Sequence, residues 1–334
     1  MWALKVNLDK TKIIIFSRGK ITKYNPFVFG NNTVDVVEDY VYLGTTFNYN
    51  GTFNKAKAKQ VQQAKKANFS LIGKVREHNF AVDVFVELFE RLVTPVLLYG
   101  SEVWGYENSR QLQVMCNNVM RRFLYLGMKE ITEYIDNRML NFWCNIATGE
   151  ESKISTILYK WIKVLYDKNT FKSPWLDKIK FLLDGIGMHS SFNNITNANK
   201  VWFKNTIKQK LNDSYIHKLS ISVFNSSTCL NYRAMTESKQ LQKYLLQLPS
   251  QYMYAMLKFK CANHRMPIVS GRYSGISVDE RKCELCDLND HYNTNGDEFH
   301  YLFNCPFFRE DRVRHIKRYY YTSPNTYKMT QLCQ

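Results

Sequence analysis

Residues 52–76 read TFNKAKAKQVQQAKKANFSLIGKVR, and their spacing favours a mainly helical protein. Its polar residues recur at intervals of four, three and four positions, at Lys55, Lys59, Gln62 and Lys66. On an α-helix this spacing places them on one face. The apolar residues that follow, Phe69, Ile72 and Val75, continue the helical pattern. The stretch therefore predicts a long helix with a basic face.

Helical patterns continue beyond this stretch. The apolar segment 82–98 is interrupted by Pro95, where we expect the helix to end or kink because proline lacks an amide hydrogen. A further helix is expected from about Arg110 to Leu126, and helical patterns recur over residues 138–183 and 200–264. Between these, the Ser/Asn-rich stretch 189–199 predicts a loop or domain boundary.

Strands are expected only near the N-terminus. Residues 13–16 are apolar and β-branched and precede a turn signal, so they predict one strand. Residues 40–47 predict a second strand, with Gly44 at a bulge or a close backbone approach. Two or three strands do not form a stable sheet alone. The expected fold is mainly α, with a small β portion at the N-terminus, a helical region and a small C-terminal zinc-binding module.

The composition favours a polyanionic partner. The 334 residues carry 46 Lys+Arg against 29 Asp+Glu, a formal charge of +17. Such an excess is typical of proteins that bind nucleic acid and, less often, anionic membrane surfaces. The alternative is a basic protein with no particular partner. A hydrophobic content of 45% excludes a wholly disordered chain.

No apolar run reaches the roughly 18 residues that a membrane span needs, so no membrane association is expected. The N-terminal residues lack the apolar region of a secretory signal. We therefore expect an intracellular protein, in the cytoplasm or the nucleus and not secreted. In such a reducing compartment, clustered cysteines indicate a metal site more than disulfides.

One motif carries specific chemistry. Cys283-x2-Cys286 and His300-x4-Cys305 supply four ligands in two closely spaced pairs, and zinc prefers thiolate and imidazole ligands in a tetrahedral set. Because all four ligands come from the protein, a closed structural zinc site is expected. His291 is an alternative to His300, and buried reduced thiols beside a surface histidine are the alternative to a metal site. The pair Cys261 and His264 is interpreted as structural.

Cations and aromatic residues follow the fourth ligand. Guanidinium and ammonium groups bind phosphates, and aromatic rings stack on bases. The segment therefore predicts a nucleic-acid-binding surface, together with the basic face at Lys55, Lys59 and Lys66. An ordinary solvated helix end explains the pattern equally well. The predicted contacts after Cys305 are Arg309, Arg312, Arg314, Lys317 and Arg318.

Four segments follow one another along the chain: residues 4–12 (LKVNLDKTK), 42–44 (YLG), 92–104 (LVTPVLLYGSEVW) and 281–305 with the Cys/His motif. In this order they resemble the C-terminal part of non-LTR retrotransposon (LINE, jockey-like) reverse transcriptases. The resemblance implies a palm remnant over 1–50, thumb-like helices over 51–128 and a helical connector over 129–188. It further implies a linker over 189–199, a helical region over 200–278 and the zinc-binding module over 279–334. The implied partners are element RNA and target DNA, while protein partners are unknown.

The chain also departs from the family pattern. The Ala-Asp-Asp turn that carries the polymerase aspartates is absent, and Asp35, Glu38 and Asp39 do not replace it. Polymerase chemistry needs paired carboxylates to hold metal ions, so Mg is expected only in the intact parent enzyme. A segment usual in relatives is missing after Glu133, which suggests an internal deletion, and the gap between Cys286 and His300 is longer than expected.

These features predict a catalytically incomplete remnant of an RNA-directed DNA polymerase, not an enzyme by itself, that retains nucleic-acid-binding surfaces. The alternatives are a free-standing zinc-dependent RNA/DNA-binding protein, a truncated gene model of an intact reverse transcriptase, and a basic helical protein that binds other proteins.

Overall fold

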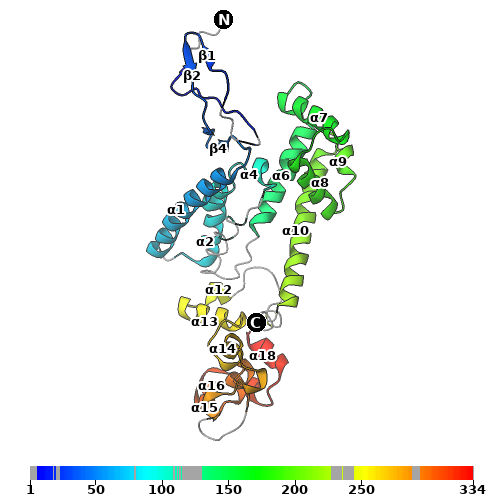
Figure 1. Cartoon of the computed structure of the whole chain (residues 1–334). Helices are drawn as coiled ribbons and strands as arrows, with labels where there is room; N and C mark the ends of the chain where they lie inside the picture. Colours follow the sequence, from blue (N-terminus) through cyan, green and yellow to red (C-terminus); the bar gives the residue numbers. More distant parts are fainter. Residues whose placement is uncertain are drawn as a thin grey trace. The chain divides into compact units, whose positions relative to one another are not determined.

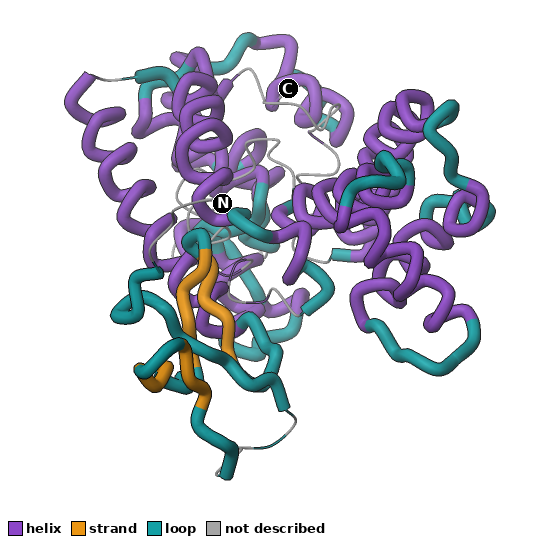
Figure 2. The backbone as a smooth tube through the Cα atoms, turned by 90° about the horizontal axis from the view of Figure 1, so that it is seen from above, coloured by secondary structure: helices purple, strands orange, loops and turns teal. Residues whose placement is uncertain are grey.

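The computed structural model describes residues 6–17, 19, 23–78, 80–107, 110, 112, 114, 130–226, 235, 244–287 and 294–333. Helices dominate this part of the chain, and the paired strands are confined to its N-terminal part (Figures 1 and 2). The predicted fold class is confirmed. The chain forms two compact units, of which the first ends at Tyr215 and the second begins at Ile216. This division lies inside helix α10 (Lys200–Asn225), downstream of the boundary expected at 189–199.

Two antiparallel hairpins form the β portion. β1 (Phe27–Phe29) pairs with β2 (Asn32–Val34), and β3 (Asp39–Tyr42) pairs with β4 (Thr45–Asn48). The single strand expected over 40–47 is thus a hairpin. Its two-residue turn has φ values of 47° at Leu43 and 82° at Gly44, as a twisted two-residue hairpin loop requires.

The strand expected at residues 13–16 is not formed. Ile13 makes one isolated bridge with Val36, whereas the amide of Ser17 donates to the carbonyl of Tyr49. The two ends of the segment therefore pair with different neighbours, and no continuous ladder can develop between them.

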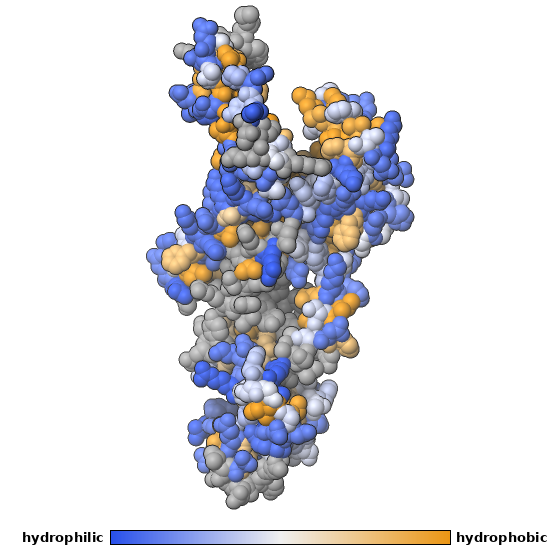
Figure 3. All heavy atoms as spheres, viewed as in Figure 1, coloured by the Kyte–Doolittle hydropathy of each residue, from blue (hydrophilic) through white to orange (hydrophobic). Residues whose placement is uncertain are grey.

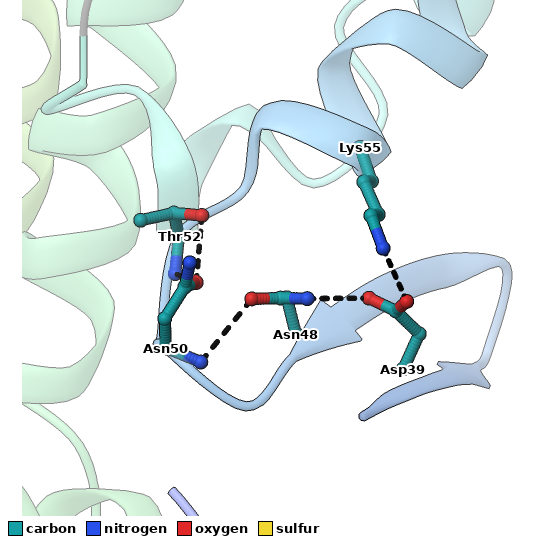
Figure 4. A network of polar contacts seen from close by, with 5 residues as sticks. All are labelled: Asp39, Asn48, Asn50, Thr52 and Lys55. Atoms are coloured by element: carbon teal, nitrogen blue, oxygen red, sulfur yellow. Dashed lines mark hydrogen bonds and ion pairs between the residues drawn. The ribbon is translucent and has the colours of Figure 1, made fainter. Parts of the chain in front are cut away.

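A polar network joins the β3–β4 hairpin to helix α1 (Asn54–His78), as Figure 4 shows. Asp39 accepts from the Asn48 amide at 2.6 Å and forms an ion pair with Lys55. The side-chain oxygen of Asn48 accepts from the main-chain amide of Asn50. The side-chain oxygen of Asn50 accepts from the main-chain amide and the hydroxyl of Thr52. The hydrogen bond from Asn48 and, next, the one from Lys55 hold the pKa of Asp39 below its ordinary value.

Helix α1 is followed by α2 (Val82–Leu88), the π turn η1 (Phe89–Val93), α3 (Thr94–Leu97) and α4 (Ser101–Trp104). The interruption expected at Pro95 takes the form of this π turn, which ends just before the proline. The helix expected over 110–126 lies almost wholly outside the described residues.

Two contacts fix the ends of these helices. The carboxylate of Glu107 accepts from the amide of Phe53, at the start of α1, and from Lys57 Nζ at 2.6 Å. This ion pair is buried, with the Lys57 side chain 5% exposed. The hydroxyl of Tyr99 donates to the carbonyl of Leu43 at 2.6 Å, so the 42–44 and 92–104 segments are in direct contact.

The core of the first unit is completed by α6 (Ile131–Ala147), α7 (Ile154–Asp167), α8 (Pro174–Gly185), α9 (Ser191–Asn194) and the first half of α10. Trp143 stacks on Phe192 with ring centroids 6.1 Å apart and meets Phe203 edge-on at 5.6 Å. Because Phe192 lies within residues 189–199, this stretch contributes a helix and a core side chain.

The second unit contains short helices around a small core of Met235, Phe303, Met329 and Cys333. No helix among the described residues is long and apolar enough to cross a membrane. Besides the end of α10, the described helices of this unit are α12 (Tyr244–Gln247), α13 (Ser250–Lys260), α14 (Pro267–Tyr273), η2 (Val278–Glu280), α15 (Glu284–Asp287), η3 (His300–Asn304), η4 (Pro306–Phe308), α16 (Arg309–His315), α17 (Arg318–Tyr321) and α18 (Thr326–Cys333).

Candidate metal centre

The fold brings the four predicted ligands together. Cys283, Cys286, His300 and Cys305 are all buried, and their ligand atoms lie within 4.8 Å of one another. Cys286 Sγ is 3.4 Å from His300 Nε2 and 3.8 Å from Cys305 Sγ. This cluster could hold a metal ion such as zinc.

The first ligand pair lies on a tight turn. The amide of Cys283 donates to the carbonyl of Thr294 at 3.0 Å, and the carbonyl of Cys283 accepts from Asp287 at 2.9 Å, which closes the short helix α15 around Cys286. Gly296 allows the two arms of this loop to approach. A Cβ there would lie 3.0 Å from the carbonyl oxygen of Lys282 and 2.8 Å from the ring of Pro267.

The second ligand pair lies on a π turn. The amide of Cys305 donates to the carbonyl of His300 at 2.7 Å, five residues back. In an α-helix, residues five apart differ by about 140° around the axis. The wider π turn reduces this offset, and such turns are frequent at functional sites. Asp297 Oδ1 accepts from the amide of His300 at 2.7 Å and caps the helical segment.

Neighbouring hydroxyl groups orient the ligands. The Thr294 hydroxyl is 3.4 Å from His300 Nδ1, so Nε2 is the nitrogen that faces the thiols. Burial lowers the pKa of His300 and outweighs the opposing charge of Asp297, while the charge of Arg312 lowers the pKa further; the net shift favours the neutral imidazole that binds metals. Burial acts to raise the pKa of Cys283, but hydrogen bonds from Tyr301 and backbone amides outweigh it, and the net shift is downward.

One predicted nucleic-acid contact belongs to this centre instead. Arg312 is only 8% exposed. Its Nε donates to the carbonyl of Leu302 and its Nη2 to the carbonyl of Cys305, both at 2.7 Å. This burial argues against the prediction that Arg312 binds nucleic acid, because its guanidinium is occupied by two main-chain oxygens at the end of the π turn.

The donor set fits zinc in particular. Three thiols and one imidazole, in two close pairs, match the ligands of closed structural zinc sites. The Thr294 hydroxyl lies where metal-binding histidines usually meet a carboxylate, a main-chain carbonyl or a water, and it can accept the same hydrogen bond. A zinc ion held by all four side chains would have no open position for water or substrate, as is typical of structural zinc sites.

The second pair, Cys261 and His264, does not join the cluster. His264 Nε2 lies 2.8 Å from Glu298 Oε1, and Cys261 is buried. The alternative ligand His291 lies outside the described residues. In the acidic group near the N-terminus, Asp35 pairs with Lys12 and Asp39 with Lys55.

The other predicted nucleic-acid contacts are accessible. Arg309, Arg314, Lys317 and Arg318 are exposed on α16, on α17 and between them. On α1, Lys55 and Lys66 are exposed and Lys59 is half-buried, while Ala56, Val61 and Ala64 face the core. The charge of Lys55 is balanced by Asp39, which leaves Lys59 and Lys66 as the stronger candidates.

The aromatic residues after the fourth ligand divide between core and surface. Tyr320 and Tyr321 pack against the core of the second unit. Tyr319 is exposed, and Lys328 Nζ lies 4.6 Å from the centre of its ring.

Sequence comparison connects the chain with mobile elements. It is 19% identical over 207 residues to a putative uncharacterized transposon-derived protein of Caenorhabditis elegans, an alignment that covers 53% of this chain and 72% of the relative. No protein-family model matches the chain. No solved structure matches it either. The similarity supports a transposon-related origin.

Proposed function

We propose that the chain is a nucleic-acid-binding remnant of a non-LTR retrotransposon reverse transcriptase, with a C-terminal module that folds around one structural zinc ion. The observation that carries the proposal is the buried Cys283, Cys286, His300 and Cys305 cluster, followed directly by helices with exposed cations. Zinc bound there would fix the π turn from which these helices begin.

Nucleic acid is the partner that best fits this surface. Arg309, Arg314 and Arg318 can pair with phosphate oxygens in a bidentate manner, which lysine cannot do. The exposed ring of Tyr319 offers a face on which a base can stack. The net charge of +17 adds long-range attraction to any polyanion. Element RNA and target DNA are the natural partners of such a remnant.

Behind the proposed origin stand a comparison that supports a transposon-related origin and a contact between two of the resembling segments. The relative in C. elegans is transposon-derived, as such a remnant would be. The resembling segments 42–44 and 92–104, distant in sequence, meet through the hydrogen bond from Tyr99 to Leu43.

The chain by itself is proposed to lack polymerase activity. No two aspartates are adjacent anywhere in its 334 residues, and the Ala-Asp-Asp turn of the family is therefore absent. Without paired carboxylates to hold two magnesium ions, primer extension should not exceed that of a vector-only control. Incorporation of nucleotides above this control would contradict this part of the proposal.

The C-terminal surface is tested by charge reversal. The variant Arg314→Glu with Arg318→Glu should bind structured RNA and duplex DNA more weakly at low salt and retain its zinc. The matched control is Lys168→Glu with Lys172→Glu, which reverses two exposed cations of the first unit. Equal loss in both variants would show that only net charge matters and would contradict a binding surface on α16 and α17.

A further inference from the structure

The most exposed large apolar side chain in the described part of the chain stands alone on a basic helix. Phe69, in the middle of α1, is 81% exposed. The neighbouring residues Leu71 and Ile72 are buried, so the helix has its own core face and does not need Phe69 for packing. In the view of Figure 3, apolar atoms lie among hydrophilic ones on the surface of α1.

A glycine lies one turn further along the same face. Residues four apart on a helix are neighbours, which places Gly73 beside Phe69. Apart from proline, glycine is the least favourable residue in a helix interior. Nothing lies within 4 Å of the position that a Cβ of Gly73 would occupy, so no contact inside the protein requires glycine there. Its effect is to leave open space beside the ring.

Cations frame this open space. Lys66 and Arg76 are exposed and lie on the same helical face, three residues before Phe69 and three residues after Gly73. Between Asn54 and His78 the only acidic residue is Glu77, which pairs with Lys74 at 2.8 Å. The face is therefore complementary to a polyanion, while its centre is a flat apolar ring.

We propose that Phe69 and Gly73 form a stacking site for one unpaired base of single-stranded nucleic acid, with Lys66 and Arg76 on the adjacent phosphates. This combination of a basic groove or face and an exposed ring is the general means of binding single strands. A duplex would not use the ring, because its bases are already stacked on each other. The inference rests on the proposed nucleic-acid binding and specifies which form of nucleic acid α1 takes.

The test uses the full zinc-loaded chain with single-stranded RNA, single-stranded DNA and a DNA duplex, the single strands carrying 2-aminopurine. Stacking on Phe69 should quench the 2-aminopurine fluorescence. Phe69→Ala should remove the quenching and weaken single-strand binding about tenfold or more, with duplex affinity unchanged. Phe69→Trp should retain both the quenching and the single-strand affinity. Phe181→Ala, which removes another exposed ring of the first unit, is the control and should change neither.

Gly73→Leu separates recognition from stability. A leucine suits the helix better than glycine, so the melting temperature should hold or rise, while its side chain fills the space beside the ring and single-strand binding should fall. If the wild-type chain binds single strands and Phe69→Ala binds them equally well, the stacking site is wrong while the proposed function stands. If the wild-type chain binds no nucleic acid, both fail. If Phe69→Ala loses affinity equally for single strands and duplex, without a change in 2-aminopurine quenching, the stacking site is also overturned.

Discussion

Arg312 donates through Nη2 to the carbonyl of Cys305 at 2.7 Å, and this bond links the first helix after the metal centre to its fourth ligand. A second bond, from Nε to Leu302, holds the same π turn. The guanidinium thereby donates to two carbonyls at the end of a short helix, which would otherwise lack a hydrogen-bond donor from within the helix.

Arg312→Ala should weaken zinc binding about tenfold or more, the size typical of residues that orient metal ligands. Competition with a chromophoric chelator measures this affinity. Arg314→Ala is the control, because Arg314 is exposed and should leave zinc affinity unchanged. Equal zinc affinity in Arg312→Ala and the wild type would show that the two hydrogen bonds do not support the centre.

Cys305→Ser should abolish stoichiometric zinc, which is expected at one ion per wild-type chain. The serine hydroxyl is a poor zinc ligand compared with a thiolate, and closed sites of this kind contribute about 10 kcal/mol or more to folding. Elemental analysis of the purified chain gives the zinc content. Cys144→Ser, at a buried cysteine of the first unit, should keep its zinc. Unchanged zinc in Cys305→Ser would place the ion elsewhere.

Glu107→Ala should destabilise the first unit by about 3–5 kcal/mol, because it leaves the buried Lys57 ammonium without this carboxylate. Glu77→Ala removes an exposed partner of Lys74 and should cost less than about 1 kcal/mol. Urea unfolding followed by tryptophan fluorescence compares the two variants. Similar unfolding midpoints would mean that the Lys57–Glu107 pair is not desolvated.

At pH values above the ordinary pKa of aspartate, ionised Asp39 should stabilise the hairpin, and this stabilisation should be lost on acidification. Its pKa is lowered in the folded chain, first by Asn48 and then by Lys55, so folding favours the ionised form. The stabilisation is therefore complete at neutral pH and disappears as the pH falls through the folded pKa. NMR titration of the carboxyl carbon should show the pKa of Asp39 rising in Asn48→Ala. An unchanged pKa would contradict the hydrogen bond of Figure 4.

The spacing of residues along the chain predicted the features that depend on neighbouring residues only. The basic face of α1, with Lys55 and Lys66 exposed and Lys59 half-buried, followed from helical spacing, and the Cys/His group followed from ligand spacing. The turn at Leu43 and Gly44 was missed because β-branched and aromatic residues continue on both sides of the glycine, which resembles a bulge within one strand.

What remained hidden depends on contacts between distant residues. A sequence lists Arg312 among neighbouring cations and cannot show that the carbonyls of Leu302 and Cys305 lie within its reach. The π turn was not predicted either, although the five-residue interval from His300 to Cys305 fits it. Phe192 appeared to belong to a polar loop because only its contact with Trp143 makes it a core residue.

The central claim is that the chain binds nucleic acid and that this binding depends on the zinc module. The most direct test is the affinity of the purified chain for a structured RNA and for a DNA duplex. Each affinity is measured at two salt concentrations, before and after zinc chelation. Binding should be strong at low salt, fall steeply as salt rises because phosphate contacts release counterions, and weaken further on chelation. Absence of binding at low salt, or binding that chelation leaves unchanged, would contradict the claim.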